Sequence, residues 1–397
     1  LPNELLYMIC AKFCSHCTDP TNDQFRYNYR SSQVISRLSK TCKRLRDIAQ
    51  PVLYHYVYPK EIWLFLRTIM VRPDLAAQVR SFRHDLDSNI NYEAEDPDTI
   101  FDPWINQPRR KNWLSQFEGI ESLDEFGIRR WLIESILTRL PNARQLFIDV
   151  PLYRRSTLGT LVDFSSVTRL VFMPPIHLGR GYLRDFLSTM PYLEELALAV
   201  LGNGSEFLHL PELRFLELFG YDIGAETLMA IIGSCPKLER FGFYGEPGLE
   251  NFRWDQVQRI LHQRRETLKH LKFRAIPYFL DEDYEVMSDR GSFRGFDGLE
   301  TLYMNAESFN TEGAKDFEAL FPIFPADVVE MVDLLPESLL CLGFYDLRCQ
   351  WKGIDVLAQA IREGHFPRLK TVYLTLEGAD LEESRSILAA VGVACKS

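Results

Sequence analysis

The sequence predicts a mixed α/β chain, in which a helical N-terminal segment precedes an irregular solenoid with a parallel sheet on its concave side and helices on its convex side. The first observation is a recurring L-x-x-L-x-L spacing, of which Leu193, Leu196 and Leu198 are the clearest copy. Second, apolar residues at helical spacing, such as Leu228 and Ile231, lie between successive copies. Third, the first 58 residues show helical periodicity and lack this spacing.

Each copy of the spacing predicts a short strand, because alternate side chains of a strand point to opposite faces and the apolar ones then share one buried face. The central apolar residues of the copies are Leu146, Leu170, Leu196, Leu216, Phe241, Leu271, Leu302, Leu342 and Val372, with Val79 and Phe82 as a possible earlier copy. Their separations fit a repeat of about 20 to 29 residues early in the chain and grow later, where insertions are expected.

The unit from Leu213 to Phe243 resembles the cysteine-containing subclass of leucine-rich repeats. In that subclass the helix ends in Cys-Pro before the next strand, as Cys235 and Pro236 do here. The resemblance implies a solenoid in which each unit buries its apolar edge only against its neighbours.

The N-terminal 58 residues resemble an F-box, the three-helix module that ties substrate receptors to the Skp adaptor of cullin-based ubiquitin ligases. LPNELL with Ile9 matches the opening motif of that family, and LSKTCKRLRDIA, from Leu38 to Ala49, matches its closing element. Apolar residues from Val34 to Ile48 predict helix that ends before Pro51. The resemblance implies that the residues facing the adaptor are Leu1, Pro2, Leu5, Ile9, Leu38, Cys42 and Leu45. The alternative interpretation is a helical pair that caps the first repeat.

The predicted organisation is therefore an F-box at 1–58, a linker helix at 59–78 and a leucine-rich-repeat domain at 79–397. Insertions are predicted near 85–127, 275–298 and 305–338. The first of these holds an acidic segment from Asp85 to Asp102, which is interpreted as a solvated loop or, alternatively, as a docking segment.

The net charge of −10 argues against nucleic acid or an anionic membrane as a main partner, because both bind basic surfaces. No stretch reaches the roughly 20 apolar residues that cross a bilayer, and the opening LPNELLYMIC lacks the features of a signal peptide. We therefore expect a cytoplasmic or nuclear protein, with its eight cysteines reduced.

Neither a catalytic motif nor a complete metal motif is present in the sequence. Cys14 and Cys17 have partial zinc spacing, with Cys10 and His16 nearby, but a second ligand pair is missing. If the first helix continues to Cys17, the three cysteines share one face and pack there or contact a partner. The prediction is no metal, no cofactor and no catalytic residue.

The residues between the repeat leucines are predicted to point onto the concave face, where aromatic and basic side chains gather. Aromatic side chains with Arg are typical of protein interfaces, and His270, Lys272 and Arg274 add a basic group. The aromatic residues from Phe215 to Tyr373 are predicted to form a continuous stripe. The predicted substrate-binding residues are Phe215, Phe219, Arg240, Tyr244, His270, Lys272, Arg274, Tyr303, Tyr345 and Tyr373. The alternative is that insertions or the chain's own tail cover them.

Together these features predict a non-catalytic substrate receptor of an SCF-type ubiquitin ligase. It would bind the Skp adaptor, and through it cullin, with its helical segment and an unknown protein substrate with its concave face. The alternative is a leucine-rich-repeat interaction scaffold that delivers nothing for degradation. An enzyme would require a pocket with paired titratable groups, for which the sequence offers no motif.

Overall fold

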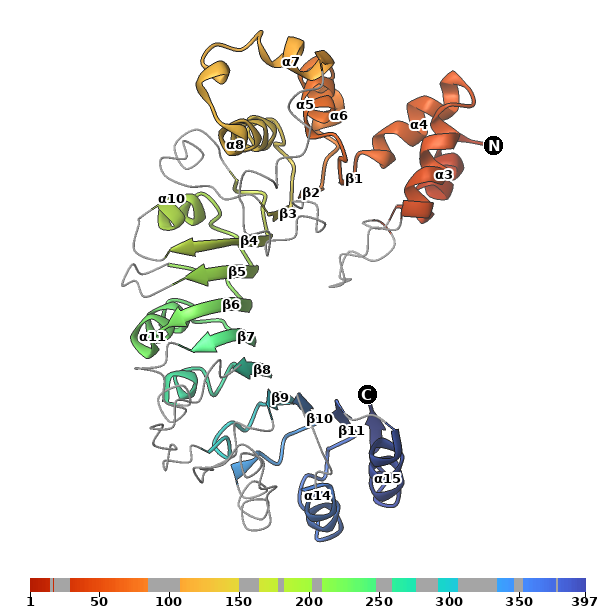
Figure 1. Ribbon diagram of the computed structural model, residues 1–397. Coiled ribbons are helices and arrows are strands. Elements are labelled where there is room, and N and C mark those ends of the chain that lie inside the picture. The colour runs from red at the N-terminus through yellow and green to blue at the C-terminus, as the bar shows by residue number, and fades with distance from the viewer. Residues whose placement is uncertain are drawn as a thin grey trace. The chain divides into compact units, whose positions relative to one another are not determined.

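The computed structural model describes residues 1–14, 17, 29–84, 108–149, 164–177, 182–201, 209–247, 259–275, 292–305, 334–345, 353–375 and 378–397 (Figure 1). Twelve strands form a sheet whose order follows the chain from β1 to β12, and the strand pairs are parallel. This is the mixed α/β, solenoid-like architecture that the repeated spacing predicted. The chain divides into two compact units, 1–174 with 185–193 and 175–184 with 194–397, and each is described by itself.

The first unit begins with a helical cluster and continues into repeating strands and helices. Its helices are α1 (Asn3–Lys12), α3 (Tyr29–Ser39), α4 (Lys43–Leu53), α5 (Ile62–Val71), α6 (Pro73–Ala76), α7 (Pro108–Leu114), the 3-10 turn η1 (Ile120–Ser122) and α8 (Glu125–Leu137). Its strands are β1 (Tyr56–Val57), β2 (Ser81–His84), β3 (Gln145–Ile148) and most of β4 (Arg169–His177).

Three sequence predictions for this unit need correction. Helix α1 ends at Lys12, so Cys10, Cys14 and Cys17 do not share one helical face. Helix α4 continues through Pro51 to Leu53, although the proline nitrogen cannot donate the i→i−4 hydrogen bond. The sheet also starts before Val79: Tyr56 and Val57 pair with Ser81 and Phe82.

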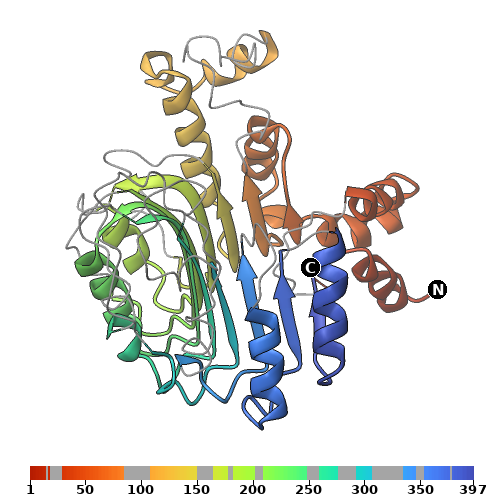
Figure 2. The same ribbon diagram turned by 60° about the horizontal axis from the view of Figure 1, so that its bottom comes forward.

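The second unit holds most of the sheet, with helices on one side. Its strands are β5 (Glu195–Leu201), β6 (Phe215–Ile223), β7 (Arg240–Pro247), β8 (His270–Ala275), β9 (Thr301–Asn305), β10 (Cys341–Tyr345), β11 (Thr371–Leu374) and β12 (Ala394–Lys396). Its helices are α11 (Ala225–Gly233), α14 (Gly353–Arg362) and α15 (Gly378–Ala389), while α10 (Tyr182–Ser188) has residues in both units. Figures 1 and 2 show α11, α14 and α15 on the same side of these strands.

The repeat leucines form the core of the sheet, as their spacing predicted. The central residues, from Leu146 on β3 to Val372 on β11, are buried. Leu146 lies in register with Leu170 in the first unit, and the central residues from Leu196 to Val372 lie in register on the paired strands of the second. Phe243 and Phe273 stack within this core at a centroid separation of 5.0 Å. In the second unit the side chains between the leucines therefore point away from the described helices α11, α14 and α15, to the side that we call the helix-free face.

A repeated backbone contact sets the entry to each strand. The carbonyl oxygen just before one strand accepts hydrogen bonds from two successive N–H groups at the start of the next. Arg214 O accepts from Glu239 N at 2.8 Å and Arg240 N at 2.9 Å. His55 O near β1 accepts in the same way from Arg80 N and Ser81 N, and Leu340 O near β10 from Lys370 N and Thr371 N. Satisfying these groups holds each strand entry in place.

The predicted insertions lie mostly outside the described residues, including the acidic segment from Asp85 to Asp102. Within the second predicted insertion, Phe293 and Phe296 are fully buried and pack against each other, with ring centroids 5.5 Å apart. Among the described helices, none combines the length and the apolar character that crossing a lipid bilayer demands.

Candidate functional site

The two N-terminal sequence motifs fold against each other. Arg44, at the start of α4, donates from Nε to Asn3 Oδ1 at 2.9 Å and from Nη2 to the Leu1 carbonyl at 2.6 Å. Cys42 caps the same helix by accepting a hydrogen bond from Leu45 N. A small apolar core beneath these contacts contains Cys10, Cys14, Ile35, Ala49 and Val52.

Several of the predicted adaptor-binding residues are exposed apolar side chains on or beside α1. Leu1 is 73% exposed, Leu5 44% and Ile9 45%. Pro2 is exposed as well. An apolar surface of this kind on a small helical cluster is typical of a docking site.

The other predicted adaptor-binding residues differ in their burial. Cys42 is exposed, Leu45 is half-buried, and Leu38 packs against the apolar core of the cluster. The motif comparison missed three further exposed residues on this side of the chain, namely Tyr7, Met8 and Phe13. Their signal was present in the sequence, because a helix with apolar residues on more than one face exposes some of them.

The second candidate site is the helix-free face of β6 to β12, where the strand register defines rows of side chains. One row aligns Phe215, Arg240, His270, Thr301, Cys341 and Thr371. The next row aligns Glu217, Gly242, Lys272, Tyr303, Gly343, Tyr373 and Lys396. A third aligns Phe219, Tyr244 and Arg274.

Two pairs of aromatic side chains on this face are in contact. Phe219 and Tyr244 stack at a centroid separation of 5.2 Å and an interplanar angle of 14°. Tyr303 and Tyr373 lie 5.5 Å apart across β10. The pairs belong to different rows, and β8 with its basic side chains lies between them. The side chain of Tyr345 lies outside the described residues.

The pair on β9 and β11 depends on a glycine between its members. A Cβ at Gly343 would lie 2.9 Å from Tyr303 Cγ and closer still to two other carbons of that ring, so the ring occupies the space above the glycine. The Cys341 thiol donates to the Tyr303 hydroxyl at 3.4 Å. Lys272 Nζ lies 5.6 Å from the centre of the Tyr303 ring, and Lys396 Nζ lies 5.6 Å from that of Tyr373.

The predicted basic group on β8 is only partly cationic. Burial, and then the positive charge of Arg240, lower the pKa of His270, so this imidazole is neutral at pH 7. His270 Nδ1 lies 3.0 Å from Thr301 Oγ1, within hydrogen-bond distance. The lasting positive charges of this face are those of Lys272, Arg274 and Arg240.

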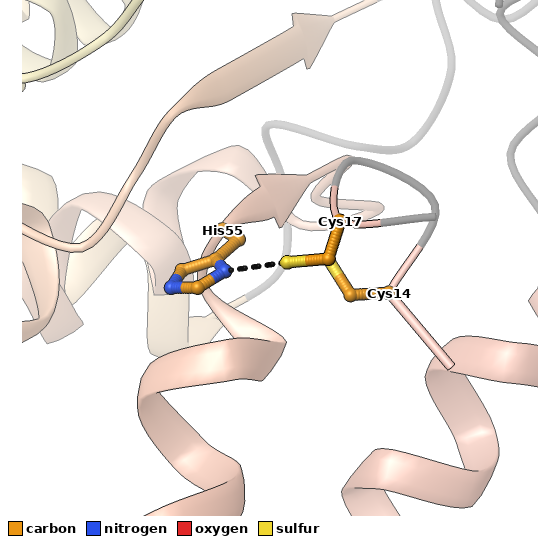
Figure 3. A group of neighbouring side chains, drawn as sticks. All are labelled: Cys14, Cys17 and His55. Atoms are coloured by element: carbon orange, nitrogen blue, oxygen red, sulfur yellow. Dashed lines mark hydrogen bonds between the residues drawn. The ribbon is translucent and has the colours of Figure 1, made fainter. Parts of the chain in front are cut away.

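A third cluster joins two cysteines to a histidine from a distant part of the chain. Beyond the end of α1, Cys17 N donates to Cys14 O at 3.0 Å. Cys17 Sγ lies 3.3 Å from His55 Nδ1, and the ligand atoms of all three side chains lie within 4.8 Å of one another (Figure 3). The sequence had drawn attention to Cys14 and Cys17 but not to His55.

Burial raises the pKa of Cys10 and Cys17 in the first unit and of Cys235, Cys341 and Cys395 in the second, which makes these thiols poor nucleophiles. Desolvation of the Cys17 sulfur, and then the adjacent Cys14 thiol, raise the pKa of Cys17 to about 12, although the residue as a whole is exposed. Burial raises the pKa of Cys235 to about 11. Catalytic cysteines require a lowered pKa, so neither thiol suits covalent catalysis.

Comparison with known proteins gives no assignment. The chain matches neither a protein-family model nor a curated protein sequence.

Proposed function

We propose that this chain is a substrate-recognition subunit of an SCF-type ubiquitin ligase, built from an F-box and leucine-rich repeats. The helical cluster of α1, α3 and α4 would bind the Skp adaptor, and through it cullin. The helix-free face would bind a protein substrate. The chain itself would do no bond chemistry: it would raise the effective concentration of an acceptor lysine near a charged conjugating enzyme.

The main support for this proposal is that the two N-terminal sequence motifs contact each other in the structure. Arg44 of the closing motif bonds directly to Leu1 and Asn3 of the opening motif. Leu1, Leu5 and Ile9 nevertheless remain exposed. A cluster that served only to cap the first repeat would bury its apolar residues against that repeat, whereas docking requires them to stay accessible.

Adaptor binding is tested by placing charges on this apolar surface. We expect Leu5→Asp with Ile9→Asp to lower the affinity for a Skp-family adaptor at least about tenfold, the equivalent of about 1.4 kcal/mol, because a carboxylate would then be desolvated in the interface. Both side chains are exposed, so the fold should survive. Leu38 is unsuitable for this test, since it packs against the core of the cluster.

The matched control is Met229→Asp on α11, because Met229 is 44% exposed, as Leu5 is, but lies in the second unit. Circular dichroism of each variant verifies its fold, and titration calorimetry measures adaptor binding. Equal affinity of the double variant and the wild type would refute docking through this surface.

The helix-free face supports the receptor role through its composition. Tyrosine, phenylalanine and arginine dominate hot spots of protein interfaces, and the Phe219–Tyr244 and Tyr303–Tyr373 pairs present them on rigid strands. We expect Tyr244→Ala with Tyr303→Ala to weaken capture of the substrate by at least about 1 to 2 kcal/mol. Affinity purification with quantitative mass spectrometry, with and without these substitutions, identifies the proteins that depend on this face.

The same experiment separates a ligase receptor from an interaction scaffold. Substrates are identified as the proteins that bind the wild type but not the Tyr244→Ala/Tyr303→Ala variant. If the chain delivers them for degradation, more of each substrate should be bound to the Leu5→Asp/Ile9→Asp variant, which does not bind the adaptor. Unchanged amounts of these proteins would favour a scaffold that delivers nothing for degradation.

A further inference from the structure

The cluster of Cys14, Cys17 and His55 has the composition and spacing of a metal site. Two thiols and an imidazole are the ligand types that bind Zn²⁺ in structural sites of proteins. Their ligand atoms lie within 4.8 Å of one another, and Cys17 Sγ is 3.3 Å from His55 Nδ1. In a tetrahedral site with Zn–S of about 2.3 Å and Zn–N of about 2.0 Å, neighbouring ligand atoms lie about 3.5 to 3.8 Å apart.

Packing and backbone hydrogen bonds hold the three residues in place. Cys14 belongs to the apolar core of the helical cluster, and Cys17 N donates to Cys14 O at 3.0 Å. His55 lies between α4 and β1, where its carbonyl accepts from Arg80 N at 3.0 Å and from Ser81 N at 2.9 Å. Such prior positioning of ligands favours metal binding, because little further ordering is needed.

The surroundings of the three ligands also fit a metal ion. Cys14 and His55 are buried while Cys17 is exposed. A metal bound there would reach solvent on one side, which leaves room for a water molecule or another ligand as its fourth partner. Figure 3 shows the Cys14 and Cys17 side chains approaching the imidazole from the same segment.

We propose that Cys14, Cys17 and His55 bind one Zn²⁺ ion, which links the segment after α1 to the junction of α4 and β1. The bound ion would join the helical cluster to the first strand of the sheet. This site does not depend on adaptor binding, so the two proposals fail or succeed separately.

Metal content and cobalt spectroscopy test the site directly. The full chain, purified in a reductant that does not chelate metals, should retain about one equivalent of zinc by elemental mass spectrometry. Titration of the metal-free chain with Co²⁺ should give thiolate-to-cobalt charge-transfer bands and intense visible bands of a tetrahedral site. We expect Cys17→Ser to weaken the charge-transfer bands and His55→Gln to shift the visible bands, with metal affinity at least tenfold lower in each.

Two cysteines outside the site provide matched controls. Cys10→Ser alters a buried thiol of the same apolar core, and Cys42→Ser alters an exposed thiol of the same helical cluster. Both should keep the wild-type metal content and cobalt spectrum. Because Cys17 is exposed, Cys17→Ser should fold, and added Zn²⁺ should raise the melting temperature of the wild type but not that of Cys17→Ser or His55→Gln.

Two results would overturn the proposal. One is a wild-type chain that retains no zinc and gives no charge-transfer bands with Co²⁺. The other is a chain purified without reductant whose mass shows a disulfide between Cys14 and Cys17 that Zn²⁺ does not prevent, since the pair would then be a redox element instead of a metal site.

Discussion

The space above Gly343 offers a sensitive test of how the helix-free face is built. In the structure the Tyr303 ring fills the position that a side chain at residue 343 would take. Gly343 has no positive φ, so alanine fits its backbone without strain. Gly343→Ala therefore changes the packing of one tyrosine and leaves the strand conformation unchanged.

The effect on stability follows from three contributions. Displacing Tyr303 removes its contact with Tyr373, about 0.5 to 1.5 kcal/mol, and its contact with Lys272, about 0.5 to 1 kcal/mol. Replacing glycine by alanine restores about 0.4 to 1 kcal/mol by restricting the unfolded chain. The net result is a loss of about 1 kcal/mol. In a Tyr303→Ala background the first two contributions are absent, so Gly343→Ala should stabilise the protein by about 0.4 to 1 kcal/mol.

The assay is urea denaturation, followed by circular dichroism, of the wild type, Gly343→Ala, Tyr303→Ala and the double variant. Hydrogen exchange of the β9 to β11 amides locates the change. Hydrogen exchange is needed because a repeat array can lose local structure before it unfolds as a whole. The reasoning predicts opposite signs for Gly343→Ala in the two backgrounds. The same sign in both would mean that Tyr303 does not lie over Gly343.

Two further predictions concern the core and the pH dependence. Leu196→Asp should lower the free energy of unfolding, measured by urea denaturation, by more than about 4 kcal/mol, because a carboxylate would be buried without a partner. Tyr192→Asp, on the exposed turn of the same repeat, should change this free energy little. Comparable losses in the two variants would argue against the buried leucine core. For His270, whose folded-state pKa is lowered, stability should fall as the pH drops below its ordinary value of about 6.5, because the unfolded chain takes up the proton first. His270→Gln should reduce this fall between about pH 7 and pH 5, and an identical pH slope for variant and wild type would exclude the lowered pKa of this half-buried imidazole.

The repeat pattern predicted the core well because a strand has only two faces. Once Leu216 is buried, Leu218 must be buried too and Phe219 must point the other way, and the structure confirms this alternation on β6. The shortest strands escaped prediction. β1 and β12 have two and three residues, too few for a period to be visible, and pairing with β2 and β11 defines them.

The arrangement on the helix-free face was less predictable, since alternation gives the direction of a side chain but not its row. Tyr244 and Tyr303 both point to this face, yet the register places Tyr303 beside Lys272 and Tyr244 beside Arg274. The two aromatic pairs therefore lie in different rows. The row of each residue depends on where its strand begins, which the backbone contacts at the strand entries determine.

The backbone contacts at the strand entries also explain why His55 was not predicted from the sequence, although the repeat pattern contained a signal for it. Val79 and Phe82 were recognised as an early copy of the repeat, and the strand register aligns Phe82 with Val57. In this alignment His55 corresponds to Arg80, so each of the two residues lies directly before a strand. There its carbonyl is fixed by the next strand, as Arg80 O is by Arg144 N and Gln145 N. The end of the helical cluster is thus also the start of the first repeat, and the imidazole beside Cys14 and Cys17 is held by the sheet.

A metal bound by these residues would therefore couple the order of the segment after α1 to the integrity of β1 and β2. For this reason, zinc removal should increase hydrogen exchange in those two strands as well as in α1.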